Sequence, residues 1–159
     1  MKYIRMHQVE AEAMTRGDYN KKRGWEIPAN ENPADEGYLV TYPDGYISWC
    51  PKAQFEAAGR PCDGMTFGMA IEAMKRGKKV ARAGWNGKGM WLCVPLVEGP
   101  KHVSMDGIWG EPNKDYAGLI GGTVKVMPYV TMKTADGCIV MGWLASQTDM
   151  LAEDWVVVE

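Results

Sequence analysis

The chain has 159 residues, and its 18 Lys plus Arg against 20 Asp plus Glu give a formal net charge of -2. This length fits one ordinary domain or two small ones. With 46% hydrophobic and 24% charged residues, the composition is typical of a soluble globular protein and excludes a disordered tail or a strongly basic nucleic-acid binder. Seven Trp and seven Tyr accompany only two Phe, a balance that favours rings stacked on ligands or placed in subunit interfaces.

The first 14 residues carry Lys2, Arg5 and Glu10 without an apolar segment, so no signal peptide is expected there. The longest apolar run, 138–145, is too short to cross a bilayer, and a cytoplasmic location is the default. The four cysteines are irregularly spaced, which predicts reduced thiols in strands rather than a zinc site. Only two histidines occur, far apart, so neither a His-centred catalytic cluster nor a metal or other cofactor is expected.

The first 60 residues are expected to form a small accessory region. In chain order, a strand is predicted at 3–9 and a helical turn at 15–22, followed by a loop at 27–37 that is rich in Pro, Asn and acidic residues. Two strand-like runs, 38–42 and 46–49, then flank Pro-Asp-Gly and predict a β-hairpin.

A short helix is predicted directly after this hairpin. Pro51 would begin it, at a position where the missing N–H costs nothing, and Gly59 would end it. Residues 59–64 then form a connector, so that a second domain is expected at 65–159.

An amphipathic helix is predicted to open the second domain. Thr66 is a suitable N-cap, apolar residues recur at helical spacing from Phe67 to Met74, and Gly77 follows a basic last turn. Strands are expected at 79–83, 90–95, 129–134, 138–144 and 155–158, and 99–128 is interpreted as a long, partly structured insertion. The predicted fold class is α+β, with small antiparallel sheets and this helix packed on the C-terminal sheet, preceded by the hairpin and short helix.

The turn around Trp85 is one candidate binding segment. Its glycines allow a ligand to approach the backbone, Trp85 offers a flat face, and Asn86 an amide that can read a base edge. Six cations and no acid between residues 75 and 88 would suit a phosphate. The alternative is that these cations complement a helix dipole and solvate a strand, because the turn matches neither a Walker loop nor a dinucleotide fingerprint.

The segment 143–150 is a second candidate. It places hydroxyls, an amide and a carboxylate behind the indole of Trp143, a set suited to ribose hydroxyls and a purine edge. The alternative is a helix start with Ser146 or Thr148 as N-cap and Trp143 as a core or interface ring, and both interpretations can hold together. Asp149 and Asp154 are otherwise interpreted as acids of a solvated turn, although they could converge as catalytic carboxylates.

The C-terminal part resembles the Thoeris anti-defense 2-like family of phage proteins. The matching segments are Met-Thr-Phe-Gly at 65–68, Val-Ala-Arg-Ala-Gly-Trp-Asn-Gly-Lys-Gly-Met-Trp at 80–91, Tyr-Val-Thr-Met-Lys-Thr at 129–134 and Trp-Leu-Ala-Ser-Gln-Thr-Asp-Met-Leu-Ala-Glu-Asp-Trp at 143–155. The N-terminal segments 35–40 and 42–49 resemble an accessory region common in phage and prophage proteins, from which no function carries over.

This resemblance implies a homotetrameric, non-enzymatic sponge in the host cytoplasm. Such a protein binds, without cleaving, the cyclic ADP-ribose isomer (glycocyclic ADP-ribose) made by Thoeris TIR enzymes, and some relatives also hold CBASS cyclic dinucleotides in a separate pocket. The expected partner is thus a small cyclic nucleotide and neither nucleic acid nor membrane. The implied ligand-binding residues are Arg82, Trp85, Asn86, Gly87, Lys88, Trp143, Ser146, Gln147 and Asp149. The alternatives are a cyclic-nucleotide hydrolase with Asp149 or Asp154 as base, and a phage structural or interaction module.

Overall fold

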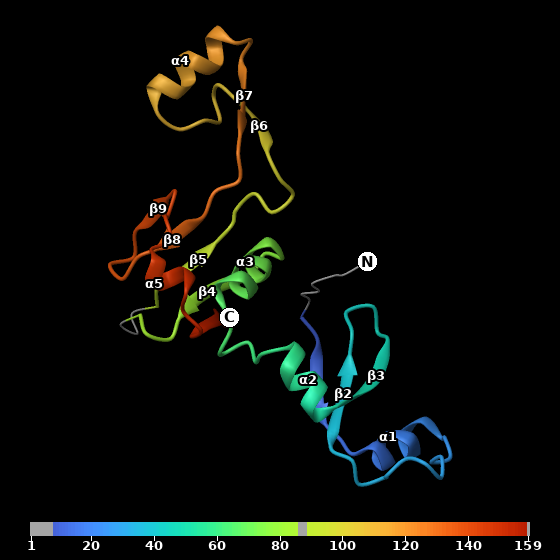
Figure 1. Cartoon of the computed structure of the whole chain (residues 1–159). Coiled ribbons are helices and arrows are strands. Elements are labelled where there is room, and N and C mark those ends of the chain that lie inside the picture. The colour runs from blue at the N-terminus through green and yellow to red at the C-terminus, as the bar shows by residue number, and fades with distance from the viewer. Residues whose placement is uncertain (1–7, 86–88, 159) are drawn as a thin grey trace. The chain divides into compact units, whose positions relative to one another are not determined.

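The computed structural model describes residues 8–85 and 89–158. The chain forms two compact units, Met1–Pro61 and Cys62–Glu159 (Figure 1). Both combine small antiparallel sheets with short helices, so the α+β prediction is confirmed. Within the described ranges, no helix is long and apolar enough to cross a membrane.

The N-terminal unit is built on a three-stranded antiparallel sheet in the order β1-β2-β3. Its strands are β1 (Glu10–Ala13), β2 (Gly37–Thr41) and β3 (Ile47–Pro51). The predicted hairpin is confirmed as β2 and β3, and Gly45 takes the positive φ of 82° that its turn requires.

The first strand of this sheet lies further along the chain than predicted. Residues 8 and 9 are not in a strand, residues 3–7 lie outside the described ranges, and β1 begins at Glu10. Its sequence Glu-Ala-Glu-Ala lacks an apolar face because β1 is an edge strand whose four side chains are all exposed. Backbone pairing with β2, and not hydrophobic patterning, therefore defines it.

Both helices expected in this unit are confirmed. Helix α1 (Arg16–Arg23) has Thr15 as its N-cap, whose side chain accepts a hydrogen bond from the Asp18 N–H, and ends at Gly24 with a φ of 68°. Helix α2 (Lys52–Ala58) has Pro51 as its N-cap and Gly59 as its C-cap.

Gly37 lies in close contact with Trp49 across this sheet. A Cβ atom on Gly37 would lie 2.5 Å from two atoms of the indole ring and 2.5 Å from the carbonyl oxygen of Cys50. We therefore expect Gly37→Ala to destabilise the N-terminal unit by about 1–3 kcal/mol, since the ring or the strand must move. Urea denaturation followed by circular dichroism measures this effect. The control is Gly59→Ala, whose Cβ would lie 3.6 Å from its nearest neighbour, and equal stability of the two variants would contradict the prediction.

The C-terminal unit contains a five-stranded antiparallel sheet in the order β10-β4-β5-β8-β9. Its strands are β4 (Lys79–Arg82), β5 (Trp91–Cys93), β8 (Thr131–Lys133), β9 (Ile139–Met141) and β10 (Trp155–Val158). The five strands predicted from the sequence are all present, although most are shorter than expected. The C-terminal strand lies at one edge beside β4, and β9 forms the other edge.

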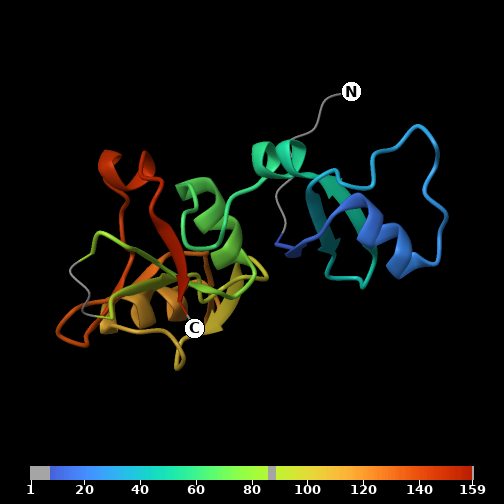
Figure 2. The same ribbon diagram turned by 90° about the horizontal axis from the view of Figure 1, so that it is seen from below.

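Helix α3 (Phe67–Lys75) packs on this sheet against β4 and β10, as predicted (Figure 2). Thr66 is its N-cap and accepts from the Met69 N–H. The buried core combines residues of the helix with residues of the central strands and β10: Met65, Ala70, Met74, Val80, Leu92 and Trp155. The core and helix α3 together hold β4 and β10 in place, and the candidate site lies beside these two strands.

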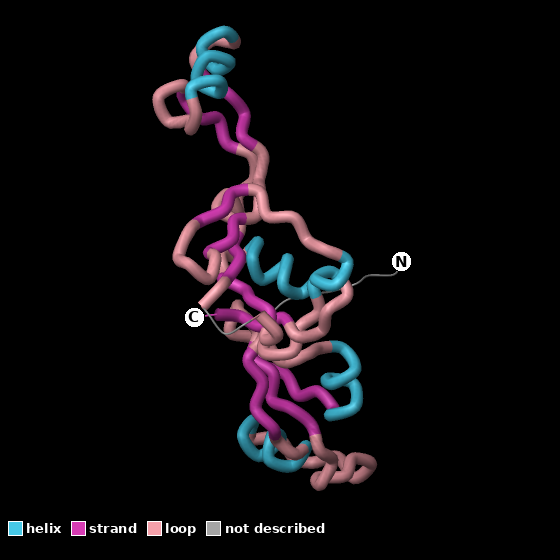
Figure 3. Tube along the Cα trace, turned by 90° about the vertical axis from the view of Figure 1, so that its left-hand side faces the viewer, coloured by secondary structure: helices cyan, strands magenta, loops and turns pink. Residues whose placement is uncertain are grey.

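Residues 99–128 are more regular than expected. They form a separate two-stranded sheet from β6 (Lys101–Ser104) and β7 (Thr123–Val126), with α4 (Glu111–Leu119) between them in the chain (Figure 3). Helix α4 packs on β7 and buries Ala117. This partly structured segment is therefore a hairpin with its own helix, neither of which the sequence predicted.

Candidate functional site

An aromatic cluster lies beside β4 and β10. Trp155 is fully buried, and its ring centroid is 5.3 Å from that of Phe67, 5.6 Å from that of Trp85 and 6.4 Å from that of Trp143. Trp85 and Trp143 are half-buried and lie 6.4 Å apart in an edge-to-face arrangement. The two tryptophans of the candidate segments thus pack against a common core ring, although they are distant in sequence.

Arg82, the last residue of β4, pairs with two carboxylates. Its Nε donates to Asp154 Oδ1 at 2.7 Å and its Nη2 to Asp154 Oδ2 at 3.3 Å. Its Nη1 lies 3.2 Å from Asp149 Oδ1 and 3.4 Å from the Thr148 carbonyl oxygen. Asp154 Oδ2 also accepts from the Gly84 N–H at 3.1 Å. The network therefore joins β4, the turn before Trp85, α5 (Gln147–Met150) and the start of β10.

These contacts change the pKa values of the charged groups. The hydrogen bond from Arg82 lowers the pKa of Asp154, and the same contact raises the pKa of Arg82. Burial acts to raise the pKa of Asp149, but hydrogen bonds from Ser146 and Arg82 outweigh it, so the net pKa lies below its usual range. Both carboxylates are ionised at neutral pH and hold the guanidinium in place.

Ser146 begins α5, which confirms the interpretation of this segment as a helix start. Its Oγ accepts from the Asp149 N–H at 3.1 Å, and its own N–H donates to Asp149 Oδ2 at 3.1 Å, forming a capping box. Thr148 is not the cap, but its hydroxyl lies 2.8 Å from that of Ser146. The capping box fixes the segment next to Trp143.

The structure brings together five of the nine residues implied by the resemblance. Arg82, Trp85, Trp143, Ser146 and Asp149 are linked through the aromatic cluster, the Arg82 network and the capping box. Gln147 is exposed at the start of α5. The remaining three, Asn86, Gly87 and Lys88, lie outside the described residues.

Asp154 lies directly before β10 with its side chain 35% exposed, but the interpretation of it as an acid of a solvated turn was incomplete. It is the main partner of Arg82, 72 residues away in sequence, and it accepts a backbone hydrogen bond as well. No local pattern could have indicated this, because the contact depends on the antiparallel pairing that places Trp155 opposite Arg82. The six cations between residues 75 and 88 were interpreted as a possible phosphate site. Two of them are instead paired with acids, Arg82 with Asp154 and Lys75 with Glu72 at 2.7 Å, which favours the alternative.

The four cysteines are free thiols, and their placement differs from the prediction. Cys50 and Cys93 lie half-buried in β3 and β5, whereas Cys62 and Cys138 are exposed outside strands. Over residues 8–85 and 89–158, no cluster of His, Cys, Asp or Glu has the composition and geometry to hold a metal ion.

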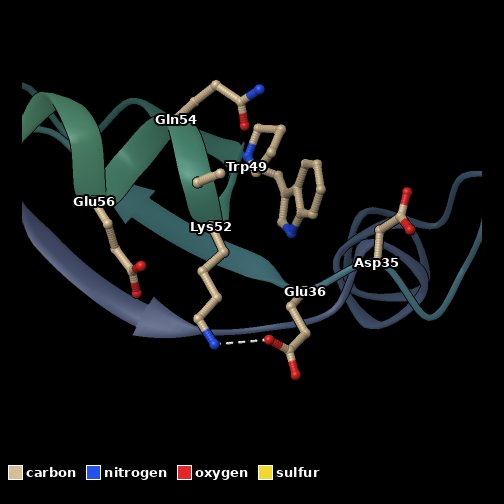
Figure 4. A pocket seen from close by; sticks show the side chains of 8 residues that line it. Asp35, Glu36, Trp49, Lys52, Gln54 and Glu56 are labelled. Atoms are coloured by element: carbon tan, nitrogen blue, oxygen red, sulfur yellow. Dashed lines mark hydrogen bonds and ion pairs between the residues drawn. The ribbon is translucent and has the colours of Figure 1, made fainter.

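A wide-open cavity of about 450 Å³ lies in the N-terminal unit, between the residues that precede β2, the end of β3 and the start of α2 (Figure 4). Trp49 and several charged side chains line it. Lys52 Nζ pairs with Glu36 at 2.8 Å, and Glu56 accepts from the Tyr38 hydroxyl at 2.9 Å. These contacts stabilise this part of the unit, and none of the residues implied by the resemblance lines the cavity.

The Arg82 network predicts that the C-terminal unit loses stability in acid. The folded-state pKa of Asp154 is below its ordinary value, so its contribution is present above about pH 4 and is lost as the pH falls through the folded pKa. Melting temperatures measured between about pH 6 and about pH 3 should decline more steeply for the wild type than for Asp154→Asn, which lacks this titration. If the melting temperatures of the wild type and of Asp154→Asn fall equally with pH, titration of Asp154 does not cause the loss of stability.

The fold and the site define a small antiparallel α+β domain in which two half-buried tryptophans meet an arginine–carboxylate network. Residues 65–158 match the family described as the Thoeris anti-defense 2-like domain, and the chain belongs to this family. It is 38% identical over 94 residues to Thoeris anti-defense 2 of Bacillus phage SP01, which covers 59% of this chain and 94% of that protein. This membership indicates a phage anti-defence role. The matched range includes the segment from β6 to β7 and begins after the N-terminal unit.

Proposed function

We propose that this protein binds and sequesters, without cleaving it, the cyclic ADP-ribose isomer that Thoeris TIR enzymes make. The observation that carries the proposal is the pair of half-buried tryptophans, Trp85 and Trp143, held 6.4 Å apart in the domain that matches the anti-defence family. Removing the signal from the host cytoplasm would keep the defence effector inactive.

The chemistry of the two segments suits a nucleotide. Stacking of a base on an aromatic ring contributes about 1–3 kcal/mol. Ser146 and Gln147 are exposed next to Trp143 and offer polar groups for ribose hydroxyls, and residues 86–88 would add an amide, a backbone N–H and a cation. The Ser146 hydroxyl caps α5 and donates to Asp149 Oδ2 at 2.6 Å, so it stabilises the start of the helix beside the proposed site.

Self-association is part of the proposal, with a homotetramer as the expected assembly. Edge strand β9 exposes Ile139, Val140 and Met141 to solvent, and Leu144 and Leu151 on either side of α5 are 88% and 81% exposed. Apolar side chains concentrated on one sheet edge are typical of surfaces that other subunits cover. Leu144 directly follows Trp143 in the chain, and a ligand bound between subunits at this site would also stabilise the assembly.

The test is recovery of the bound molecule. The protein is incubated with glycocyclic ADP-ribose, washed and heat-denatured, and the released material is analysed by mass spectrometry. Release of the intact signal supports sequestration, whereas release of a cleaved product would establish the hydrolase alternative. If no material is released and the ligand does not raise the melting temperature, the remaining alternative is a phage structural or interaction module.

A second ligand class is tested with the same protein. We propose that CBASS cyclic dinucleotides bind at a separate site, in keeping with the family resemblance. If this is correct, a cyclic dinucleotide should raise the melting temperature further in protein already saturated with the cyclic ADP-ribose isomer. Competition between the two ligands would contradict separate sites.

A further inference from the structure

The two tryptophan-bearing segments are joined by a single guanidinium–carboxylate network. All three nitrogen atoms of the Arg82 guanidinium donate to acceptors of the 148–154 segment. At the other end of the network, Asp154 Oδ2 accepts from the N–H of Gly84, the residue before Trp85. The position of the Trp85 turn relative to α5 is thus set by contacts of Arg82 and Asp154.

The surrounding residues make this network rigid. A Cβ on Gly84 would lie 3.1 Å from Asp154 Oδ2, so the backbone approaches the carboxylate closely. The Trp155 indole, next to Asp154 in the chain, donates from Nε1 to the Asp149 carbonyl oxygen at 3.0 Å. A planar guanidinium that pairs with a carboxylate through two parallel hydrogen bonds fixes orientation as well as distance.

We propose that Arg82 and Asp154 are positioning residues that hold the Trp85 turn at the correct distance from α5 and Trp143 without contacting the ligand. This inference rests on the proposed function and specifies which residues of the site do not touch the nucleotide. It departs from the resemblance, which places Arg82 among the ligand-binding residues. With four hydrogen bonds to Asp149, Asp154 and the Thr148 carbonyl, Arg82 has few of its five N–H donors left for a phosphate.

The two roles of Arg82 predict opposite effects of Asp154→Asn. If Arg82 binds the phosphate, removing a competing carboxylate should leave affinity unchanged or increase it. If Arg82 and Asp154 act together as positioning residues, Asp154→Asn and Arg82→Gln should each weaken binding of glycocyclic ADP-ribose by about tenfold or more. The double variant should lose less binding free energy than the sum of the two single losses, because both substitutions break the shared Arg82–Asp154 contact.

Fluorine NMR tests the positioning directly and without ligand. The tryptophans are replaced by 5-fluorotryptophan, and the Trp85 and Trp91 resonances are assigned with Trp85→Phe and Trp91→Phe. We expect Asp154→Asn and Arg82→Gln to move the Trp85 resonance and to leave that of Trp91, in β5, unchanged. Ala117→Gly, which removes a buried methyl group from α4 outside the network and the aromatic cluster, controls for general loss of stability and should move neither the Trp85 resonance nor the affinity.

The outcomes separate this inference from the proposed function. A wild-type protein that binds no nucleotide would refute the proposed function, while the Trp85 resonance would still report on positioning. A wild-type protein that binds, together with an Asp154→Asn variant of equal or higher affinity, would overturn the positioning role. An unmoved Trp85 resonance in both variants would overturn it as well.

Discussion

Replacing Trp155 by alanine is expected to unfold the C-terminal unit or bring it close to unfolding. The side chain is fully buried, contacts the rings of Phe67, Trp85 and Trp143, and donates a hydrogen bond from its indole nitrogen. Truncation of a buried tryptophan to alanine costs about 3–5 kcal/mol, because apolar burial is lost and a cavity remains. A small domain has only about 5–15 kcal/mol of stability in total.

Urea denaturation measures this loss, and peptide-level hydrogen exchange over β4 and β5 assigns it to the C-terminal unit. The control is Trp109→Ala, which removes the same ring from a position that is 74% exposed and should change stability by less than about 1 kcal/mol. If the two variants are equally stable, Trp155 does not organise the core.

Replacing Trp85 or Trp143 by alanine is expected to weaken binding of glycocyclic ADP-ribose strongly. Removing either ring would cost about 1–3 kcal/mol of binding free energy from stacking, which corresponds to roughly a 5- to 150-fold increase in Kd. Both rings also pack against Trp155, so part of the loss would come from a less ordered site. Isothermal titration calorimetry of the variants, at a temperature where each is folded, measures the effect.

The matched control for this experiment is Trp91→Ala. Trp91 is half-buried in β5, in the same sheet, and its ring contacts Lys79 at 6.0 Å instead of the aromatic cluster. Its removal should cost stability with little change in Kd. Unchanged affinity in both the Trp85 and Trp143 variants would show that the nucleotide is bound elsewhere, or not at all.

The structural elements that could be predicted from the sequence are those defined by short-range signals. Thr66 and Gly77 bracket helix α3, since a hydroxyl caps the first turn and a glycine with positive φ follows the last. The turns at Gly45 and Gly137 mark hairpins for the same reason, because each glycine takes a φ that other residues rarely adopt. Strand β1 was not predicted because its exposed Glu-Ala-Glu-Ala sequence carries no apolar pattern.

For the candidate site too, only the features made of neighbouring residues could be predicted. The motifs around Trp85 and Trp143 could be recognised from the sequence because each is a contiguous run of residues. The partner of Arg82 could not, since an ion pair to Asp154 leaves no mark on the residues near either group.

By itself, the sequence determined helices α1, α2 and α3, the β2–β3 and β8–β9 hairpins and the family, because caps, turns and contiguous motifs act over a few residues. Only the tertiary structure decided that Trp85 and Trp143 share Trp155 as a common packing partner and that Arg82 faces carboxylates. The physical reason is that β10 pairs antiparallel with β4, which places Trp155 opposite Arg82. Contacts of this kind depend on strand order and register, which no local pattern encodes.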